Sequence, residues 1–395
     1  MASRAAAKEA TQRQTAPWEL PPPSSVFYDD VEECRACFAP LIGASTDDIA
    51  LVPATSYAMA VAAKNLLPPG RLQPGDQILV IEQQFQSNYY VWEEAARAAG
   101  AEMLVCPRAD DFDWTGAIVG ILRAELTRVQ QEQVTSTANA TPKDACSTAS
   151  GSPNRIKLVS LPTVHWQDGS VLDLVAIGKL VRELGAHLVI DGTQTVGAVP
   201  FDVAEVQPDF MCASAYKWLL CPYGLAFLYA APRWQQEGTP LEHHQWERTG
   251  AAFYRRAFTP GARRFDSGQR SNFITLPAAV ASLNQLQEWG PANISAYIQP
   301  LVERAAARAA ELGMSSPPPA CRSPHMIGVR VTKSSGLTEE DLEQVSNELL
   351  KRGIHVSIRG TAIRISPNVW NTIEDVDVLF DELQTLLPAI KRSAL

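Results

Sequence analysis

The stretch DFMCASAYKWLL, residues 209–220, begins as an apolar strand and reaches a lysine, Lys217, in the polar turn that follows. A second stretch, AHLVIDGTQ at residues 186–194, has a similar design, because its apolar run stops at Asp191. In open α/β sheets, ligands bind at the edge where the parallel strands end. We therefore expect an amine and a carboxylate to lie together at one edge of a sheet.

A lysine and an aspartate in this placement suit one kind of cofactor chemistry. The amine can form a Schiff base with a carbonyl cofactor, and the carboxylate can hold a pyridine nitrogen protonated, as pyridoxal phosphate requires. The alternative is two unrelated polar residues at the rim of a sheet. The spacing of Lys217 and Asp191 does not decide between these interpretations, so other motifs must.

Hydrophobic periodicity predicts the fold class. Short apolar runs alternate with helical segments over residues 49–229, and an amphipathic stretch such as residues 87–99 ends at Gly100, as helices closed by a left-handed glycine do. This alternation predicts an α/β fold with helices on both faces of a sheet. After residue 273 the pattern becomes helical and then βαβ-like, which predicts a smaller C-terminal domain.

Composition divides the chain further. Residues 1–20 begin with an alanine-rich segment without an apolar face, which predicts a disordered tail, with a transit peptide as the alternative. Residues 130–154 are almost all small or polar, so we expect a flexible insertion there. The insertion lies inside a predicted large domain of residues 21–272, and residues 273–395 form the predicted small domain.

Charge and cysteine content exclude several classes of protein. The net charge of −9 argues against nucleic acid or an anionic membrane as partner, and no apolar run approaches the roughly 18 residues that cross a bilayer. Seven cysteines, without a secretory signal, indicate reduced thiols and a cytoplasmic protein. Cys34 and Cys37 lack a second pair at zinc-ligand spacing, so we expect helix packing and no metal site. A small molecule is the expected partner.

Two further motifs follow the lysine turn. They are RRFDSG at residues 263–268 and AIRISP at residues 362–367, the latter followed by WNT at residues 370–372. Together with the turns at Asp191 and Lys217, they resemble the class V aminotransferase family of fold-type I pyridoxal phosphate enzymes. The resemblance implies a large domain with a mostly parallel central sheet, a smaller C-terminal α+β domain, a homodimer, and pyridoxal 5'-phosphate as cofactor.

The resemblance also implies roles around the cofactor. Lys217 carries the internal aldimine and then moves protons, Asp191 keeps the pyridine nitrogen protonated, and Tyr216 is a second acid or a packing residue. Helix capping by the Thr-Ser pair at residues 55–56 and core packing of Phe85 are the alternatives to a cofactor role. The remaining implied contacts are the phosphate with Thr55, Ser56 and Ser214, the ring face with Phe85, and the ring hydroxyl with Gln194 or His165.

Other implied contacts involve the substrate and a second subunit. A phosphate-binding threonine that relatives donate from the neighbouring subunit falls on Gln269, with Ser271 and Asn272 as alternatives. Arg364 matches the family's clamp for the substrate α-carboxylate, a task that suits the planar fork of arginine. Arg359 lies nearby and is expected to contact an acid on the substrate side chain.

Departures from the desulfurase pattern guide the expected reaction. Between Cys321 and Arg364 there is no cysteine, where desulfurases carry their nucleophile, and Phe85 and Tyr216 stand where desulfurases have histidines. We expect cleavage or elimination on the β side of a small α-amino acid, as by a carbon–sulfur lyase or kynureninase-like enzyme. An aminotransferase or an epimerase is the alternative. A non-catalytic cofactor-binding protein is a remote one, because it would not need Asp191, Lys217 and Arg364 together.

Overall fold

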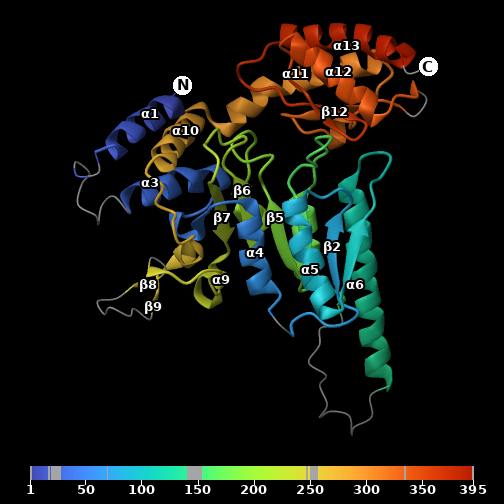
Figure 1. Ribbon diagram of the computed structural model, residues 1–395. Helices are drawn as coiled ribbons and strands as arrows, with labels where there is room; N and C mark the ends of the chain where they lie inside the picture. Colours follow the sequence, from blue (N-terminus) through green and yellow to red (C-terminus); the bar gives the residue numbers. More distant parts are fainter. Residues whose placement is uncertain are drawn as a thin grey trace.

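The computed structural model describes residues 2–16, 18, 28–68, 70–139, 154–245, 248–249, 257–332 and 335–393. A seven-stranded sheet forms the centre of the larger part of the molecule (Figure 1). Its strand order is β1-β7-β6-β5-β4-β2-β3. The strands are β1 (Ile49–Val52), β2 (Gln77–Ile81), β3 (Glu102–Cys106), β4 (Ile156–Pro162), β5 (His187–Asp191), β6 (Phe210–Ser214) and β7 (Ala226–Ala230).

The sheet is mostly parallel, as expected. Only β7 runs antiparallel to its two neighbours, β6 and β1, within this sheet. Successive side chains of a strand point to opposite faces, so Ile78 and Val80 join one apolar cluster, whereas Leu79 and Ile81 join the other. On one face of the sheet, the first cluster includes residues of the helices α4 (Thr55–Leu66) and α5 (Tyr90–Ala99). On the other face, the second cluster includes residues of four helices: α3 (Asp29–Phe38), α6 (Trp114–Asn139), α7 (Leu174–Glu183) and α10 (Thr275–Trp289).

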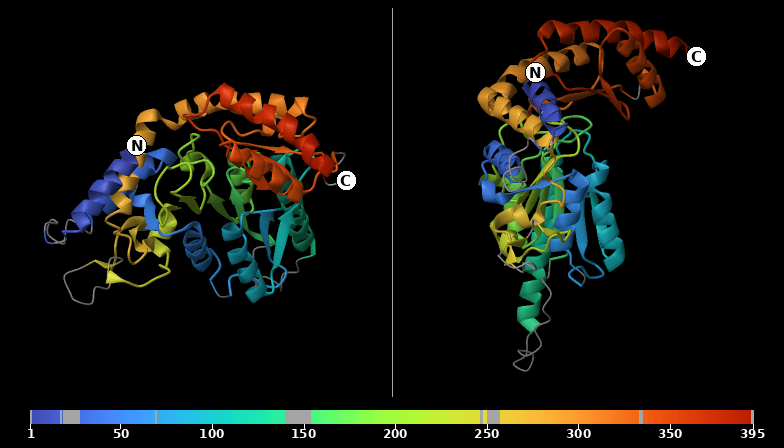
Figure 2. Two further views of the ribbon diagram at one scale, coloured as in Figure 1. Left: turned by 45° about the horizontal axis from the view of Figure 1, so that its top comes forward. Right: turned by 60° about the vertical axis from the view of Figure 1, so that its left-hand side comes forward.

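The first helix corrects a prediction. Residues 2–14, expected to belong to a disordered tail, form α1 (Ala2–Gln14), which lies beside α10 (Figure 2). Ala10 is only 1% exposed. Alanine is the strongest helix former, and small side chains allow close packing against a neighbouring helix, so a segment with little amphipathic pattern is ordered by its tertiary contact.

The predicted insertion is also partly helical. α6 continues to Asn139 and takes up the first part of residues 130–154. Residues 140–153 lie outside the described residues. Smaller elements of the larger part are α8 (Val203–Val206), α9 (Pro232–Glu237), β8 (Arg248–Thr249) and β9 (Ala257–Phe258).

The C-terminal part is α+β, as expected. A three-stranded sheet in the order β10-β12-β11 faces the larger part, with helices above it (Figure 1). All its pairs are antiparallel, so the parallel pairing implied by a βαβ pattern is wrong. A two-residue turn with Gly360 at φ 58° joins β11 to β12, and so short a link permits only a hairpin. The elements are α11 (Pro291–Glu311), β10 (Ile327–Arg330), α12 (Glu339–Lys351), β11 (Ser357–Arg359), β12 (Ala362–Ile365) and α13 (Ile373–Ser393).

No helix of the described part of the chain is long and apolar enough to span a membrane. Within the same residues, no group of three or more His, Cys, Asp or Glu side chains is placed to hold a metal ion. Cys37 instead packs on α10, where its thiol donates to the amide oxygen of Asn284 at 3.2 Å.

Candidate active site

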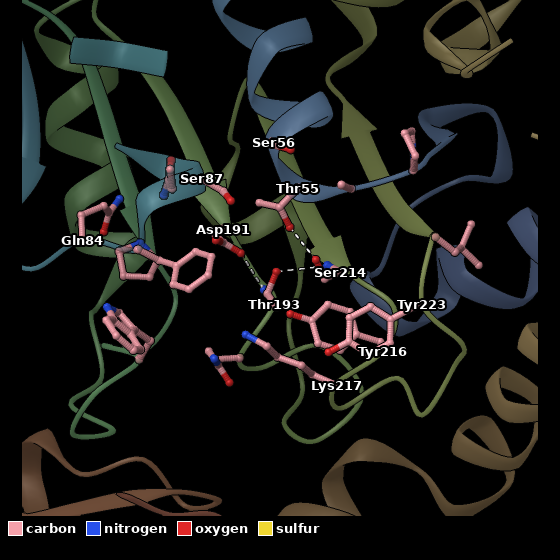
Figure 3. Close-up of a pocket in the computed structure, with 18 of the residues that line it drawn as sticks. Thr55, Ser56, Gln84, Ser87, Asp191, Thr193, Ser214, Tyr216, Lys217 and Tyr223 are labelled. Carbon is pink, nitrogen blue, oxygen red and sulfur yellow. Dashed lines mark hydrogen bonds between the residues drawn. The ribbon is translucent and has the colours of Figure 1, made fainter. Parts of the chain in front are cut away.

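A cavity of about 260 Å³ lies where the central parallel strands end (Figure 3). The neighbouring strands β5 and β6 bring Asp191 and the turn that holds Lys217 to the same edge, as the two opening stretches predicted. The cavity wall includes most of the side chains that we expected at the cofactor: Thr55, Ser56, Phe85, Asp191, Gln194, Ser214, Tyr216 and Lys217.

Asp191 is a buried carboxylate at the end of β5. Its Oδ1 accepts a hydrogen bond from the backbone N–H of Thr193 at 3.0 Å. Burial raises the pKa of Asp191, while the contacts with Thr193 and the charge of Lys217 oppose the rise. A buried carboxylate with one neutral donor gains most from a further cationic partner. Asp191 is therefore suited to a protonated ring nitrogen.

Lys217 is half-buried in the turn after β6. Its Nζ lies 5.2 Å from the centre of the Phe85 ring. Burial lowers the pKa of Lys217; Asp191 opposes this, and the charges of Arg364 and Arg359 add to it. A lowered pKa leaves more of the amine neutral, which is the form that attacks a carbonyl carbon.

The start of α4 forms a corner of the cavity. Thr55 Oγ1 lies 2.6 Å from Ser214 Oγ, and the backbone N–H of Ser214 donates to Thr193 Oγ1 at 3.0 Å (Figure 3). The residue that precedes the helix, Ala54, has no side-chain oxygen to cap it. Backbone N–H groups of the first turn and the exposed Ser56 hydroxyl are thus available to a phosphate, which the helix dipole also attracts. Capping alone does not explain this corner.

Two aromatic rings form the wall opposite this corner. Phe85 follows β2 and meets Trp166 edge-on, with ring centres 5.6 Å apart. The indole N–H of Trp166 donates to the carbonyl of Gln83 at 2.7 Å, which fixes the indole against the loop that carries Phe85.

Two tyrosines lie next to the lysine. The rings of Tyr216 and Tyr223 stack with centres 4.0 Å apart, and Lys217 Nζ lies 5.7 Å from the centre of the Tyr216 ring (Figure 3). Burial, followed by the neighbouring Tyr223, raises the pKa of Tyr216. Its phenol therefore keeps its proton at neutral pH.

His165 does not reach the cavity, which corrects one of the two expected partners of the ring hydroxyl. It is fully buried, stacks on Trp114 with ring centres 5.2 Å apart, and places Nδ1 3.1 Å from Asp168 Oδ1. The neighbouring Trp166 takes the place on the cavity wall. Gln194 lines the cavity and remains the candidate for that contact.

Sequence reasoning missed His325, which contacts two residues of the site region, Gln194 and Trp218. Its Nε2 donates to the carbonyl of Gln194, and its Nδ1 lies 2.6 Å from the Ser323 hydroxyl. The ring also meets Trp218, next to Lys217, at 4.6 Å between centres. Nothing in the local sequence around His325 points to the contacts with Gln194 and Trp218, because these two partners lie far away along the chain.

The two substrate-binding candidates contact Trp166 and are not among the residues that line the cavity. Arg364, on β12, donates from Nη1 to the carbonyl of Trp166 at 2.9 Å. Arg359, on β11, places its guanidinium 5.3 Å from the centre of the Trp166 ring. Burial, followed by the charge of Arg359, lowers the pKa of Arg364 to about 10. Both arginines therefore contact a residue of the cavity wall.

The predicted cross-subunit residues lie away from the cavity of their own chain. Gln269 and Asn272 are exposed. Asn272 Oδ1 accepts from the backbone N–H of Thr275 at 2.9 Å, so the side chain caps the start of α10. A phosphate contact by Gln269 or Asn272 would require a second chain.

A sheet with this order, whose carboxyl edge holds a buried aspartate and a half-buried lysine beside the start of a helix, is that of a pyridoxal phosphate enzyme of fold type I. The model of the family Aminotransferase class-V matches residues 19–115 and 121–379, so the chain belongs to that family. Its cofactor is pyridoxal 5'-phosphate.

Relatives in this family carry different activities. An uncharacterized aminotransferase of Bacillus subtilis, YcbU, is 26% identical over 356 residues, which cover 90% of this chain and 83% of that protein. The isopenicillin N epimerase of Streptomyces clavuligerus is 25% identical over 373 residues, 90% of this chain and 84% of the epimerase. Names at this level of identity do not select one reaction.

Solved structures share the fold. The apo cysteine desulfurase of Thermococcus onnurineus NA1 has a TM-score of 0.77 at 19% identity, with 97% of this chain and 92% of that chain covered. A complex between the cystine C–S lyase C-DES and its product cysteine persulfide also has a TM-score of 0.77, at 16% identity and with 98% and 94% covered. These likenesses confirm the predicted fold class.

Proposed function

We propose that the protein is a lyase that cleaves or eliminates a group from the β-carbon of a small α-amino acid. The observation that carries the proposal is the pairing of two proton carriers, the Lys217 amine and the Tyr216 phenol, on one wall of the cavity. β-Elimination needs a base at the α-carbon and an acid at the departing group. Transamination moves its proton with the lysine alone.

The remaining residues bind and orient. Thr55, Ser56 and Ser214 would hold the cofactor phosphate, Phe85 the ring face, and Asp191 the ring nitrogen. When bound, the cofactor withdraws electrons from the substrate α-carbon. Arg364 would hold the α-carboxylate through its planar fork, with Trp166 at its side. These assignments extend the predictions from the sequence and stay proposals.

Proton movements by this chain then follow from the geometry. Lys217, as a neutral amine, takes the proton from the α-carbon. The bond from the β-carbon to the departing group breaks with its electron pair on that group, and Tyr216 gives it a proton. Uptake of water completes a keto acid and ammonia. The raised pKa of Tyr216 keeps its proton available for this step.

The positions of the cysteines in the described residues support an enzyme that releases the departing sulfur, and not one that transfers it to a cysteine. The cavity wall includes none of the six cysteines Cys34, Cys37, Cys106, Cys212, Cys221 and Cys321. Burial raises the pKa of each. A thiol is nucleophilic only as its thiolate. None of these six is therefore placed to accept sulfur as a desulfurase nucleophile does.

We also propose that two chains form the active unit. Tyr223 lines the cavity although its side chain is 76% exposed. Gln269, which matches a residue that relatives donate across the subunit interface, is exposed and does not line its own cavity. Light scattering that gives twice the mass of one chain supports the homodimer; a stable monomer with full activity contradicts it.

Incubation of the cofactor-loaded enzyme with a panel of amino acids and S-substituted cysteines tests the reaction. We expect equal amounts of keto acid, ammonia and thiol. Borohydride should fix the cofactor on the wild-type chain but not on Lys217→Ala. Keto acid formed only with a keto-acid acceptor indicates transamination, and inversion at the α-carbon indicates epimerisation; either result contradicts the proposal.

A substitution at Tyr216 distinguishes its role from that of Lys217. Tyr216→Phe should slow thiol release by about a hundredfold but leave exchange of the α-proton with deuterated solvent nearly unchanged, because Lys217 performs that exchange. Tyr90→Phe, on the exposed face of α5, is the matched control and should change neither rate. Equal loss of both rates in Tyr216→Phe would reduce Tyr216 to a packing residue.

A further inference from the structure

Two arginines of the small sheet converge on one residue of the cavity wall. β11 and β12 are antiparallel neighbours, and they bring Arg359 and Arg364 to the same tryptophan. Arg364 bonds the carbonyl of Trp166, whereas Arg359 lies over its ring. Cation–π contact of this kind holds a guanidinium in place without neutralising its charge.

Neither arginine has a carboxylate partner among the described residues. The Nε of each is buried without a hydrogen-bond acceptor in this part of the chain. Arg359 Nη1 donates to the backbone carbonyl of Ile358. By contrast, Arg330 on the adjoining strand β10 forms an ion pair with Asp168 at 3.0 Å. Of these three arginines of the small sheet, Arg330 thus has a counter-ion among the described residues, and Arg359 and Arg364 have none.

The charges around the site do not balance. Lys217, Arg359 and Arg364 are near enough for both arginines to lower the pKa of the lysine, and Asp191 is the carboxylate that offsets them. The cofactor phosphate would lie in the corner of Thr55 and Ser214, where hydroxyls and helix N–H groups meet it. A single substrate carboxylate can occupy one arginine, so a second guanidinium remains without an anion.

We propose that Arg359 forms a subsite for a second anionic group, so that the substrate is an amino acid whose side chain ends in a carboxylate or a similar anion. The inference rests on the proposed function for the role of Arg364. It adds the substrate class: Arg364 takes the α-carboxylate and Arg359 takes the anion of the side chain. Trp166 spaces the two guanidinium groups and limits the length of the substrate.

Binding of two unreactive acids tests the subsite. Succinate and butyrate have the same number of carbons, but only succinate carries an anion at both ends. We expect the cofactor-loaded enzyme to bind succinate at least about tenfold more tightly than butyrate by calorimetry, because a hydrogen bond to a charged group contributes that much. Equal affinities, or no binding of either acid, would overturn the subsite.

Two variants test whether Arg359 is the source of the preference for succinate. Arg359→Gln keeps a side chain of similar length without the charge, and it should reduce the preference for succinate to less than about threefold. Arg123→Gln, the same change on the exposed face of α6, should preserve it. Unchanged cofactor absorbance shows that each variant is folded. A preference that survives Arg359→Gln assigns the second anion elsewhere and contradicts the proposal.

This outcome is separable from that of the proposed function. Succinate preference combined with transamination products would retain the subsite and reject the lyase. Elimination of neutral S-substituted cysteines without any succinate preference would retain the lyase and reject the subsite.

Discussion

The two sides of the cavity differ in how completely their polar groups are paired. On the side of the large domain, hydrogen bonds join Thr55 to Ser214, Ser214 to Thr193 and Thr193 to Asp191. On the side of the small sheet, the Nε atoms of Arg359 and Arg364 are buried without an acceptor among the described residues. One side is a connected network, and the other is a pair of like charges.

The difference indicates what each side binds. A buried polar group without a partner costs about 1 to 3 kcal/mol, and more if it is charged. A connected network suits a group that stays in place, because it orients its donors before the group arrives. Unpaired arginines suit an anion that comes and goes, since binding then relieves a cost that the free enzyme carries. This difference supports the proposal that the network holds the cofactor and the arginines bind the substrate.

The largest effect is expected from a substitution in the hydrogen-bonded network. Asp191→Asn keeps an oxygen for the Thr193 N–H but removes the negative charge, so turnover should fall by on the order of a thousandfold. The apoprotein should become more stable at neutral pH, because the buried carboxylate no longer has to ionise. Steady-state kinetics and thermal unfolding of the apoprotein measure the two effects.

The sign of the stability effect follows from the raised pKa of Asp191. A carboxyl whose pKa is higher in the folded state contributes stability below its ordinary pKa and loses that contribution as the pH rises through the folded value. The stability gain of Asp191→Asn should thus be present at neutral pH and shrink in acid. An apoprotein variant less stable than wild type at neutral pH would indicate that Asp191 is paired by a cation even without cofactor.

A smaller effect is expected on the arginine side. Arg364→Lys keeps the charge but loses the two-pronged contact with a carboxylate. Transition-state binding should therefore weaken by roughly 2 to 4 kcal/mol, which lowers kcat/KM by about 30- to 900-fold. Cofactor absorbance should not change, because the network is untouched. Amines without a carboxylate should lose little more in the variant. If Arg364→Lys is normal while Arg359→Lys fails, the α-carboxylate belongs to Arg359.

The sequence predicted the network side well because its signals are local. Asp191 and Lys217 each follow an apolar strand within a few residues, and adjacent parallel strands end at the same edge. Thr55 and Ser56 likewise stand at a helix start that the sequence marks. The helix expected to end at Gly100 does so for the same reason, as α5 shows, since periodicity is a property of short segments.

Long-range packing explains what the sequence could not predict. His165 and Trp166 are neighbours, and long-range contacts place them differently: His165 stacks on Trp114, whereas Trp166 bonds to Gln83 and lines the cavity. His325 binds Gln194 across 131 residues of sequence, and no local pattern reports such a contact. The helix of residues 2–14 depends in the same way on α10, so composition alone suggested a tail.

The smallest expected effect concerns two thiols near the network. Cys212 and Cys221 flank Lys217 in sequence but lie buried off the cavity wall, where burial raises the pKa of both, that of Cys221 to about 12. The double variant Cys212→Ser, Cys221→Ser should lower stability by about 1 to 2 kcal/mol in chemical unfolding, because hydroxyls fit these apolar sites less well. Its turnover should stay within about twofold of wild type, because a thiol outside the cavity transfers no sulfur. A persulfide on either cysteine during turnover of L-cysteine, seen by mass spectrometry and lost in the variant together with activity, would make one of them a nucleophile.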